Sequence, residues 1–249
     1  MQIARKIVIG GRPLVPATLQ VHVAMSTVGT ATFQAGPEAL TPGPADPRAI
    51  ERLLGSAKGQ LAECFVSVAG KQDFLVLMGP VVQVQGSRGT FDVTVRELCT
   101  VMDIPTAIYA RQCTAREIVS KVEQKCGLHF LVPARAPFLD EIKPIFQFTG
   151  TCRAALERVI QAWDLPEVVW YQLPDGTMFF GPWRMGPFTK AEVPVEERLV
   201  MEKSLEERTL RLPMIPALRP GMIVNCGFRF RIDELELEQD SVLIHWTRL

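Results

Sequence analysis

Three glutamates occur at every second position near the end of the chain, and paired carboxylates are groups that enzymes use as general acids and bases. Glu234, Glu236 and Glu238 alternate with apolar residues, so on a strand all three side chains project from one face. Glycoside hydrolysis needs two carboxyl groups that face each other across a cleft, and a row on one strand does not provide them. The row is therefore either a solvated outer face or an acidic lining.

Other side chains of catalytic type lack suitable partners. Asp140 and Glu141 form a second carboxylate cluster. Cys99 or Cys126 with His129 would supply a nucleophile and a base, but Cys126 lies at the end of an amphipathic helix, and no third group is placed to orient the histidine. The chain also lacks a Gly-x-Gly-x-x-Gly or Walker loop for phosphate and a Gly-x-Ser-x-Gly elbow. We therefore expect no catalytic residue and no enzyme activity.

Metal binding is not indicated by the sequence either. Zinc sites need clustered ligands, whereas the six cysteines are scattered without a Cys-x-x-Cys pair and the three histidines do not cluster with them. One histidine, His22, lies on the polar side of an alternating segment and should face solvent or a partner. We expect no metal, no cofactor and six reduced thiols. The cysteines are Cys64, Cys99, Cys113, Cys126, Cys152 and Cys226, and the histidines are His22, His129 and His245.

Composition limits the partners of the protein. The 27 basic and 27 acidic residues give a net charge of zero, which argues against a dedicated nucleic-acid binder with a basic stripe. No run of about 18 apolar residues suggests a transmembrane helix. The first residues lead directly into a strand pattern rather than a signal peptide. We expect that the protein does not insert into a membrane and that it assembles in a reducing cytoplasm.

Strand patterns dominate residues 1–97. Leu19, Val21 and Val23 alternate with polar neighbours, and similar alternation recurs up to the end of this segment. Residues 36–47 are rich in proline and glycine and form a loop, after which Asp46-Pro47 begins a short helix. About six strands and one helix predict a small N-terminal β-barrel.

A small α/β unit is expected over residues 98–188. A capping box from Thr114 to Glu117 begins a helix that ends at Gly127. A second amphipathic helix spans Thr151 to Trp163, and a hairpin with the turn Pro174-Asp175-Gly176 follows. The four tryptophans are expected in cores or interfaces, because no basic residues interleave with them; they are Trp163, Trp170, Trp183 and Trp246.

Residues 189–249 return to strand patterns. The charged stretch Glu196–Arg208 fits either a solvated helix or an extended strand. Phe230 and Leu235 share one face only if the alternation slips by one residue, so a β-bulge is predicted near Asp233-Glu234. The predicted fold class is α+β, mainly β, with two small tube-like β-barrels, 1–97 and 189–249, flanking the α/β unit.

The order of these motifs resembles the tail hub proteins of bacteriophages, namely the late-control D family and the Mu-like baseplate hub, and is similar to the hub portion of type VI secretion spike proteins. The resemblance covers roughly Leu98–Leu249 well and the N-terminal segment in outline. The residues that carry it are Thr114-Ala-Arg-Glu117-Ile-Val, the Gly127-Leu128 strand, the helix ending near Trp163, Tyr171 with Asp175-Gly176 and Phe180-Gly181, Leu218-Arg-Pro-Gly221-Met, and the terminal Arg231–Leu249 hairpin.

The resemblance implies a structural protein of the virion tail that assembles as a homotrimeric ring in the host cytoplasm. Three subunits with two barrels each would present six similar barrels to the hexameric tail tube protein, while the spike or tail-tip protein attaches on the other side. Such a symmetry adaptor would let genomic DNA pass during ejection without binding it. Part of the row Glu234, Glu236 and Glu238 would then line the lumen or its rim. Two alternatives stay open: a tail-associated cell-wall hydrolase, and a barrel-type receptor or carbohydrate-binding module.

Overall fold

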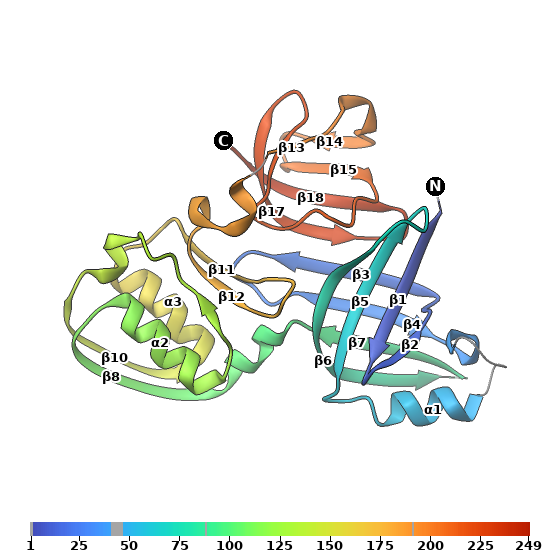
Figure 1. Cartoon of the computed structure of the whole chain (residues 1–249), viewed down its shortest axis with the longest axis horizontal. Coiled ribbons are helices and arrows are strands. Elements are labelled where there is room, and N and C mark those ends of the chain that lie inside the picture. Colours follow the sequence, from blue (N-terminus) through green and yellow to red (C-terminus); the bar gives the residue numbers. More distant parts are fainter. Residues whose placement is uncertain (1, 41–46, 88, 191) are drawn as a thin grey trace. The chain divides into compact units, whose positions relative to one another are not determined.

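The computed structural model describes residues 2–40, 47–87, 89–190 and 192–249. The chain forms two compact units, one from Met1–Leu98 together with Phe188–Leu249 and one from Cys99–Pro187 (Figure 1). The chain therefore leaves the first unit and later returns to complete it. The expected fold class, α+β and mainly β, is confirmed.

The first unit is built from an N-terminal and a C-terminal flank, both rich in strands. The N-terminal flank contains β1 (Ile3–Ile9), β2 (Arg12–Leu14), β3 (Thr18–Ala24), β4 (Thr30–Ala35), η1 (Pro37–Ala39), α1 (Pro47–Gly55), β5 (Leu61–Val68), β6 (Asp73–Ser87) and β7 (Thr90–Arg96). The C-terminal flank contains β13 (Glu192–Pro194), η6 (Glu197–Leu199), β14 (Glu202–Ser204), β15 (Thr209–Pro213), β16 (Ile223–Asn225), β17 (Arg229–Leu237) and β18 (Ser241–Arg248). The expected helix is thus present as α1, and Asp46, which was expected to cap it, lies outside the described residues. The charged stretch Glu196–Arg208 contains a short 3-10 turn, η6, and a short strand, β14.

One continuous ladder of strands joins the two flanks. The strand order is β14-β15-β18-β17-β3-β4-β7-β6-β5-β1-β2, and β16 pairs off this path with both β13 and β17. The junction is an antiparallel pairing of β17 with β3, in which Leu235 is opposite Val23. Buried residues of both flanks, among them Phe33 and Phe230, belong to one hydrophobic core. The two flanks are therefore one structural unit.

The prediction of two β-barrels is not confirmed. The described ladder ends at β14 and at β2 and does not close on itself. One edge of β17 pairs with β16 along residues 229–231 and with β3 along residues 234–237. A free strand edge leaves backbone N–H and C=O groups unpaired. The pairing of β17 with β3 provides hydrogen-bond partners for the edge of each of these two strands. The structure therefore does not support the expectation that three subunits present six similar barrels to the tail tube.

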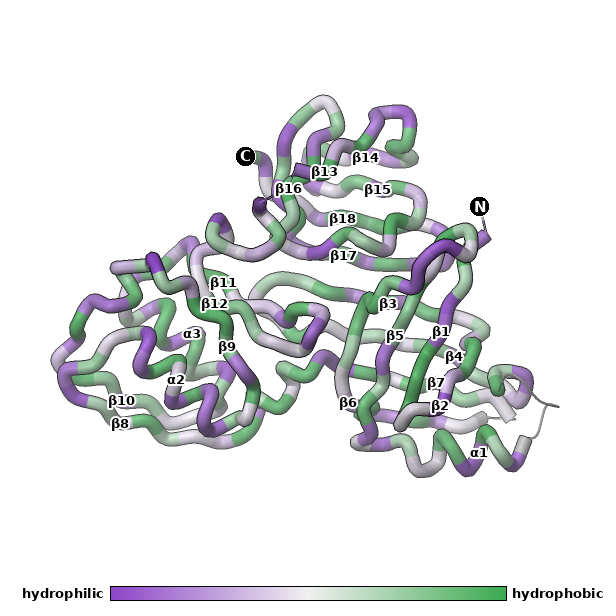
Figure 2. The backbone as a smooth tube through the Cα atoms, in the orientation of Figure 1, coloured by the Kyte–Doolittle hydropathy of each residue, from purple (hydrophilic) through white to green (hydrophobic). Residues whose placement is uncertain are grey.

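The predicted β-bulge in β17 is confirmed. The register with β18 shifts between Ile232 and Glu234, so Asp233 is the extra residue. Phe230 and Leu235 are both 0% exposed, although unbroken alternation would place them on opposite faces. The alternation of hydrophobic and hydrophilic residues along β17 can be followed in Figure 2. The bulge therefore keeps the apolar residues on both sides of it in the core.

The second unit packs two helices against a two-stranded sheet. Its elements are η2 (Leu98–Asp103), β8 (Pro105–Cys113), α2 (Ala115–Cys126), β9 (Phe130–Leu131), η3 (Pro137–Asp140), β10 (Lys143–Thr151), α3 (Cys152–Ala162), β11 (Val168–Gln172), β12 (Met178–Pro182), η4 (Trp183–Met185) and, at the return to the first unit, η5 (Pro187–Lys190). β8 pairs with β10, and β11, β12 and β9 form a separate small sheet. Figure 1 shows α2 and α3 on the same side of the β8–β10 sheet. The expected hairpin is β11–β12, where Asp175 Oδ1 accepts a hydrogen bond from the N–H of Thr177 at 2.9 Å.

The predicted capping box begins α2. The N–H of Glu117 donates to Thr114 Oγ1 at 3.2 Å, and the N–H of Thr114 donates to Glu117 Oε2 at 2.9 Å. Gly127 ends the helix with a φ of 71°, in the left-handed region.

Replacing Thr114 with alanine removes an acceptor for one N–H of the first turn of α2. We expect the free energy of unfolding to fall by about 1 kcal/mol, measured by urea denaturation. Thr114→Ser keeps the hydroxyl and should stay within about 0.5 kcal/mol of the native chain. Equal stability of the alanine and serine variants would show that the cap contributes nothing.

Candidate functional site

Of the three glutamates singled out in the sequence, Glu234 and Glu236 lie on the outer face of β17, and Glu238 directly follows the end of that strand. Leu235 and Leu237, which alternate with them, are 0% and 4% exposed. Glu234, Glu236 and Glu238 are partly exposed on the other face. The structure therefore places all three on one surface, and the idea that this surface lines a channel stays a prediction.

Each of the three glutamates has a basic neighbour on an adjacent element. Glu234 Oε1 contacts His22 Nε2 on β3, and Glu236 Oε1 lies 3.7 Å from His245 Nε2 on β18. Arg211 on β15 donates from Nη1 to Glu238 Oε2 at 2.6 Å, and this hydrogen bond raises the pKa of Arg211. The row is therefore mixed in charge and not a bare acidic wall.

The histidines of this surface were not assigned to a site from the sequence. His22 was expected on the polar face of its strand, and its side chain is indeed 40% exposed. Its contact with Glu234 spans 212 positions of the chain, so no local pattern predicts it. A hollow of about 210 Å³ lies beside His22 and Glu236 and is also lined by Gln20, Thr30 and Thr32.

The alternative nucleophile and base pair is not assembled in the described structure. His129 Nδ1 lies 2.9 Å from Glu123 Oε1, while Cys126 Sγ points to the backbone oxygen of Glu123 at 3.9 Å. Burial raises the pKa of Cys126, which disfavours the reactive thiolate. Cys99 is fully buried. The arrangement therefore supports structural roles for these cysteines.

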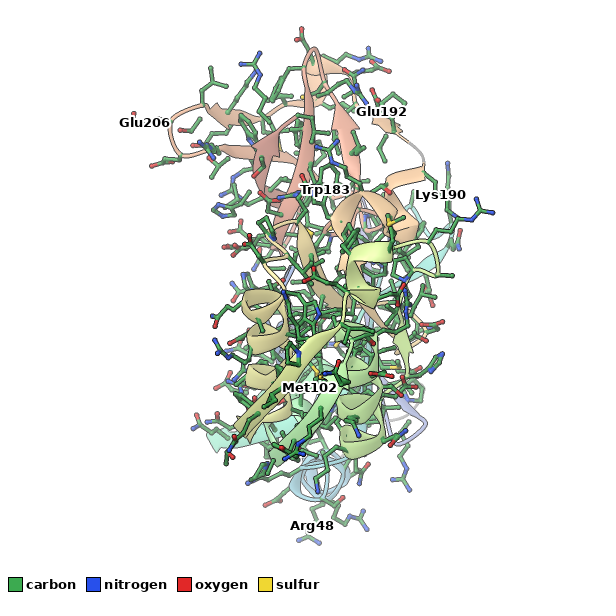
Figure 3. All side chains as sticks on the ribbon, turned by 90° about the vertical axis from the view of Figure 1, so that its left-hand side faces the viewer. Arg48, Met102, Trp183, Lys190, Glu192 and Glu206 are labelled. Atoms are coloured by element: carbon green, nitrogen blue, oxygen red, sulfur yellow. The ribbon has the colours of Figure 1, made fainter. Side chains whose placement is uncertain are left out.

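The second carboxylate cluster is occupied by basic side chains. Arg116 Nε lies 2.8 Å from Asp140 Oδ1, and this hydrogen bond lowers the pKa of Asp140. Lys143 Nζ lies 2.6 Å from Glu141 Oε1. Charged residues elsewhere project outward, as Figure 3 shows for Glu206 at the turn after β14. Among the described residues, these contacts give no pair of carboxylates facing each other across a cleft.

The tryptophans are core residues, as expected. All four are at most 6% exposed, in the order of the chain 4%, 0%, 6% and 5%. No helix in the described ranges is long and apolar enough to cross a lipid bilayer.

The thiols give a pH-dependent prediction. Burial raises the pKa of Cys64 from 9.0 to about 12, and it also raises the pKa values of Cys113, Cys152 and Cys226. The thiol of Cys64 loses its proton near pH 9 in the unfolded chain but only near pH 12 in the folded chain. Its contribution to the free energy of unfolding is therefore complete below pH 9 and is lost as the pH rises toward 12.

Between these limits the free energy of unfolding should fall with pH by up to about 1.4 kcal/mol per pH unit for Cys64 alone. Thermal unfolding measured across the alkaline range should show a shallower slope for Cys64→Ala than for the native chain. Equal slopes would contradict the prediction.

Alkylation and mass spectrometry of the denatured, unreduced chain should find six free thiols, and a stoichiometric disulfide would overturn the expected reduced state.

No protein-family model matches the chain. An uncharacterized 58.7 kDa protein of Haemophilus phage HP1 is 23% identical over 150 residues, which cover 60% of this chain. The match covers 27% of that protein, so the chain spans about a quarter of the length of this relative.

Solved structures match over nearly the whole chain. The 43 kDa tail protein of prophage MuSo2 from Shewanella oneidensis has a TM-score of 0.68 at 12% identity, with 98% of each chain covered. The tail protein from Neisseria meningitidis MC58 has a TM-score of 0.65 at 11% identity, with 100% of this chain and 97% of that chain covered.

A third structure links the fold to secretion systems. It is the E. coli c3393 protein, a component of the type VI secretion system with structural similarity to the T4 bacteriophage tail proteins gp27 and gp5. It has a TM-score of 0.66 at 11% identity, with 98% of this chain and 76% of that chain covered. At such low identity the likeness establishes a shared fold. The resemblance to phage tail proteins and to the type VI secretion proteins related to them is therefore confirmed at the level of the fold.

Proposed function

We propose that this chain is a structural protein of a phage tail and that it acts as the hub between the tail tube and the spike or tail-tip protein. The observation that carries the proposal is a fold shared with a prophage tail protein over 98% of both chains. A shared fold alone does not imply a shared function, so the proposal also needs support from the surface and the chemistry of the chain.

The surface suits a protein that works through interfaces. On the outer side of the β8–β10 sheet, Tyr109 is 55% exposed and Ile145 is 59% exposed. In the C-terminal flank, Met201 is 58% exposed and Leu205 is 66% exposed. Tyr109 and Ile145 lie on one face of two paired strands, and exposed apolar side chains that gather on one face often mark contacts with other subunits. They fit the homotrimer and the neighbouring tail proteins that the hub role requires.

The chemistry of the chain supports a mechanical role. In the described ranges, the candidate thiols are buried or directed at backbone, and the carboxylates of Asp140 and Glu141 are held by Arg116 and Lys143. Among these groups, none is a free base or nucleophile beside a cleft. We therefore propose a non-enzymatic protein that acts without a cofactor, in the virion tail, after assembly in the host cytoplasm.

The continuous sheet changes how the hub would meet the tube. Because β17 pairs with β3, each subunit offers one extended β surface in place of two independent barrels. The proposal therefore keeps the threefold ring and the contact with a sixfold tube, and it does not derive the sixfold pattern from two matching barrels.

Passage of DNA fits the charge of the outer face of β17. Lys and Arg contacts to phosphate would hold DNA through counterion release. The arginines of this region are already in ion pairs and are not free phosphate ligands. On β17, Arg229 pairs with Glu192 and Arg231 pairs with Asp233. On β15, Arg211 pairs with Glu238 and Glu202. A lumen that includes the row Glu234, Glu236 and Glu238 would let the duplex slide without specific binding.

Deletion of the gene from the encoding phage or prophage tests the proposal. A hub is needed to build the tail, so electron micrographs of the lysate should show no assembled tails, and expression of the chain in trans should restore them. A hydrolase would instead leave assembled tails that adsorb but fail to penetrate. A receptor or carbohydrate-binding module would leave assembled tails that fail to adsorb. Either of these two outcomes would refute the hub.

A further inference from the structure

We propose that the outer face at the junction of the two flanks holds a site for a divalent transition-metal ion of the Zn²⁺ type. The site, called the His/Glu cluster below, consists of His22 on β3, Glu234 and Glu236 on β17, and His245 on β18. The inference does not depend on the tail assignment.

Strand register brings the cluster together. Glu236 is directly opposite His22 in the pairing of β17 with β3, and Glu234 is directly opposite His245 in the pairing of β17 with β18. Directly opposed residues have Cβ atoms about 4.5–5.5 Å apart. The four side chains therefore start from neighbouring positions on one surface, with β17 in the middle.

The ligand atoms already lie close to one another. One nitrogen or oxygen from each of His22, Glu234 and Glu236 lies within 4.8 Å of the others. His245 Nε2 is 3.7 Å from Glu236 Oε1, so a fourth ligand is within reach. Ligands about 2.0–2.2 Å from a tetrahedral Zn²⁺ are about 3.3–3.6 Å from each other. His22, Glu234 and Glu236 must move closer together to reach that geometry, and His245, which lies outside the 4.8 Å group, must turn toward it.

The β-bulge contributes to this arrangement. Asp233 is an extra residue in β17, so the face that carries Glu234 and Glu236 begins directly after the bulge. Bulges occur preferentially where a strand must redirect side chains beside a functional site. The bulge keeps Leu235 in the core while both glutamates stay on the surface with the two histidines.

The charges around the cluster favour a cation. Among the described residues, none of the four cluster side chains forms an ion pair with lysine or arginine. The two glutamates instead contact the histidines. Arg211 is held at Glu238 and Glu202. The two carboxylates therefore have no lysine or arginine as a counter-charge. A divalent ion would supply it.

The ligand types select the class of metal. Two imidazoles and two carboxylates suit Zn²⁺ and similar transition ions, whereas Mg²⁺ and Ca²⁺ prefer oxygen ligands. Access is open, because the side chains of His22 and Glu236 are each 40% exposed and the hollow of about 210 Å³ adjoins them. The ion would connect β3 of the N-terminal flank to β17 and β18 of the C-terminal flank, and would stabilise their junction.

Calorimetric titration of the full chain with ZnCl₂ at about pH 7.5 tests the proposal, because metal ligands bind in their deprotonated forms. The chain carries Cys126→Ser to remove the partly exposed thiol as a competing ligand. We expect one equivalent of Zn²⁺ to bind, no saturable binding of MgCl₂, and a rise in the thermal unfolding midpoint with Zn²⁺, because the ion binds only the folded junction. Co²⁺ in the same site should give the visible absorption of tetrahedral coordination.

Matched variants locate the site. Glu236→Gln and His22→Ala should each weaken Zn²⁺ binding at least about tenfold. Glu238→Gln, directly after β17 and paired with Arg211, and His129→Ala, in the second unit, should leave the affinity unchanged. Far-ultraviolet circular dichroism of each variant verifies folding, and His245→Asn replaces any variant that fails to fold. Absence of equimolar binding, or binding that Glu236→Gln leaves unchanged, would overturn the proposal.

Discussion

Replacing Phe230 with alanine should lower the free energy of unfolding of the first unit by about 3–5 kcal/mol. Phe230 is 0% exposed, and its ring centroid lies 5.1 Å from that of Phe228 and 5.6 Å from that of Trp246. The substitution removes a large buried ring from the core that both flanks share. Chemical denaturation measures the loss.

The same variant tests whether the two flanks unfold together. Because β17 pairs with β3, hydrogen exchange should become faster at amides of β3, β4 and β7 as well as in the C-terminal flank. Leu205→Ala, at a side chain that is 66% exposed, should change the stability by less than about 0.5 kcal/mol. Faster exchange confined to the C-terminal flank would contradict the shared core.

Replacing Arg219 with methionine should cost about 2–3 kcal/mol, because the substitution leaves partly buried carbonyl groups without a donor. The guanidinium donates to the oxygens of Pro216 at 2.7 Å and Leu218 at 2.6 Å, and also to the oxygen of Leu75 in β6. It therefore ties the loop before β16 to the N-terminal flank.

One effect opposes this loss. Burial lowers the pKa of Arg219 to about 10, which shows that the charged form is costly there, and methionine avoids that cost. We expect the three lost hydrogen bonds to outweigh it. Arg198→Met is the matched control, because Arg198 is 80% exposed and pairs with Glu196. Urea denaturation that finds Arg219→Met as stable as the control would contradict the account.

Features with local signals could be predicted from the sequence. The capping box at Thr114, the turn at Asp175 and the bulge at Asp233 each depend on residues within a few positions of one another. Their physical causes are side-chain hydrogen bonds to nearby backbone and the strict alternation of a strand. All three are present in the structure.

Features that join distant strands could not be predicted in the same way. The residues of β3 and β17 do not show with which strand each of them pairs, because the backbone groups that form the hydrogen bonds are the same in every sequence. The two flanks were therefore each expected to close alone, whereas β17 pairs with β3. Closing each flank into a barrel and joining the two flanks into one sheet would both pair the free strand edges. The alternation in the sequence is compatible with both arrangements.

The candidate site divides along the same line. The common face of Glu234 and Glu236 follows from alternation along one strand, and the outward direction of His22 follows from alternation along another. Their meeting depends on the register between β3 and β17, across 212 positions for the contact of His22 with Glu234. Alternation therefore predicted the face on which each residue lies, but the sequence analysis expected no metal and did not predict the cluster.

The most direct test of the central claim is an electron cryo-microscopy reconstruction of the intact tail in which the density of this chain is located. We expect three copies in one ring around the channel, between the last ring of the tail tube and the spike or tail tip. One copy or six copies per ring, or a position away from the channel, would contradict it.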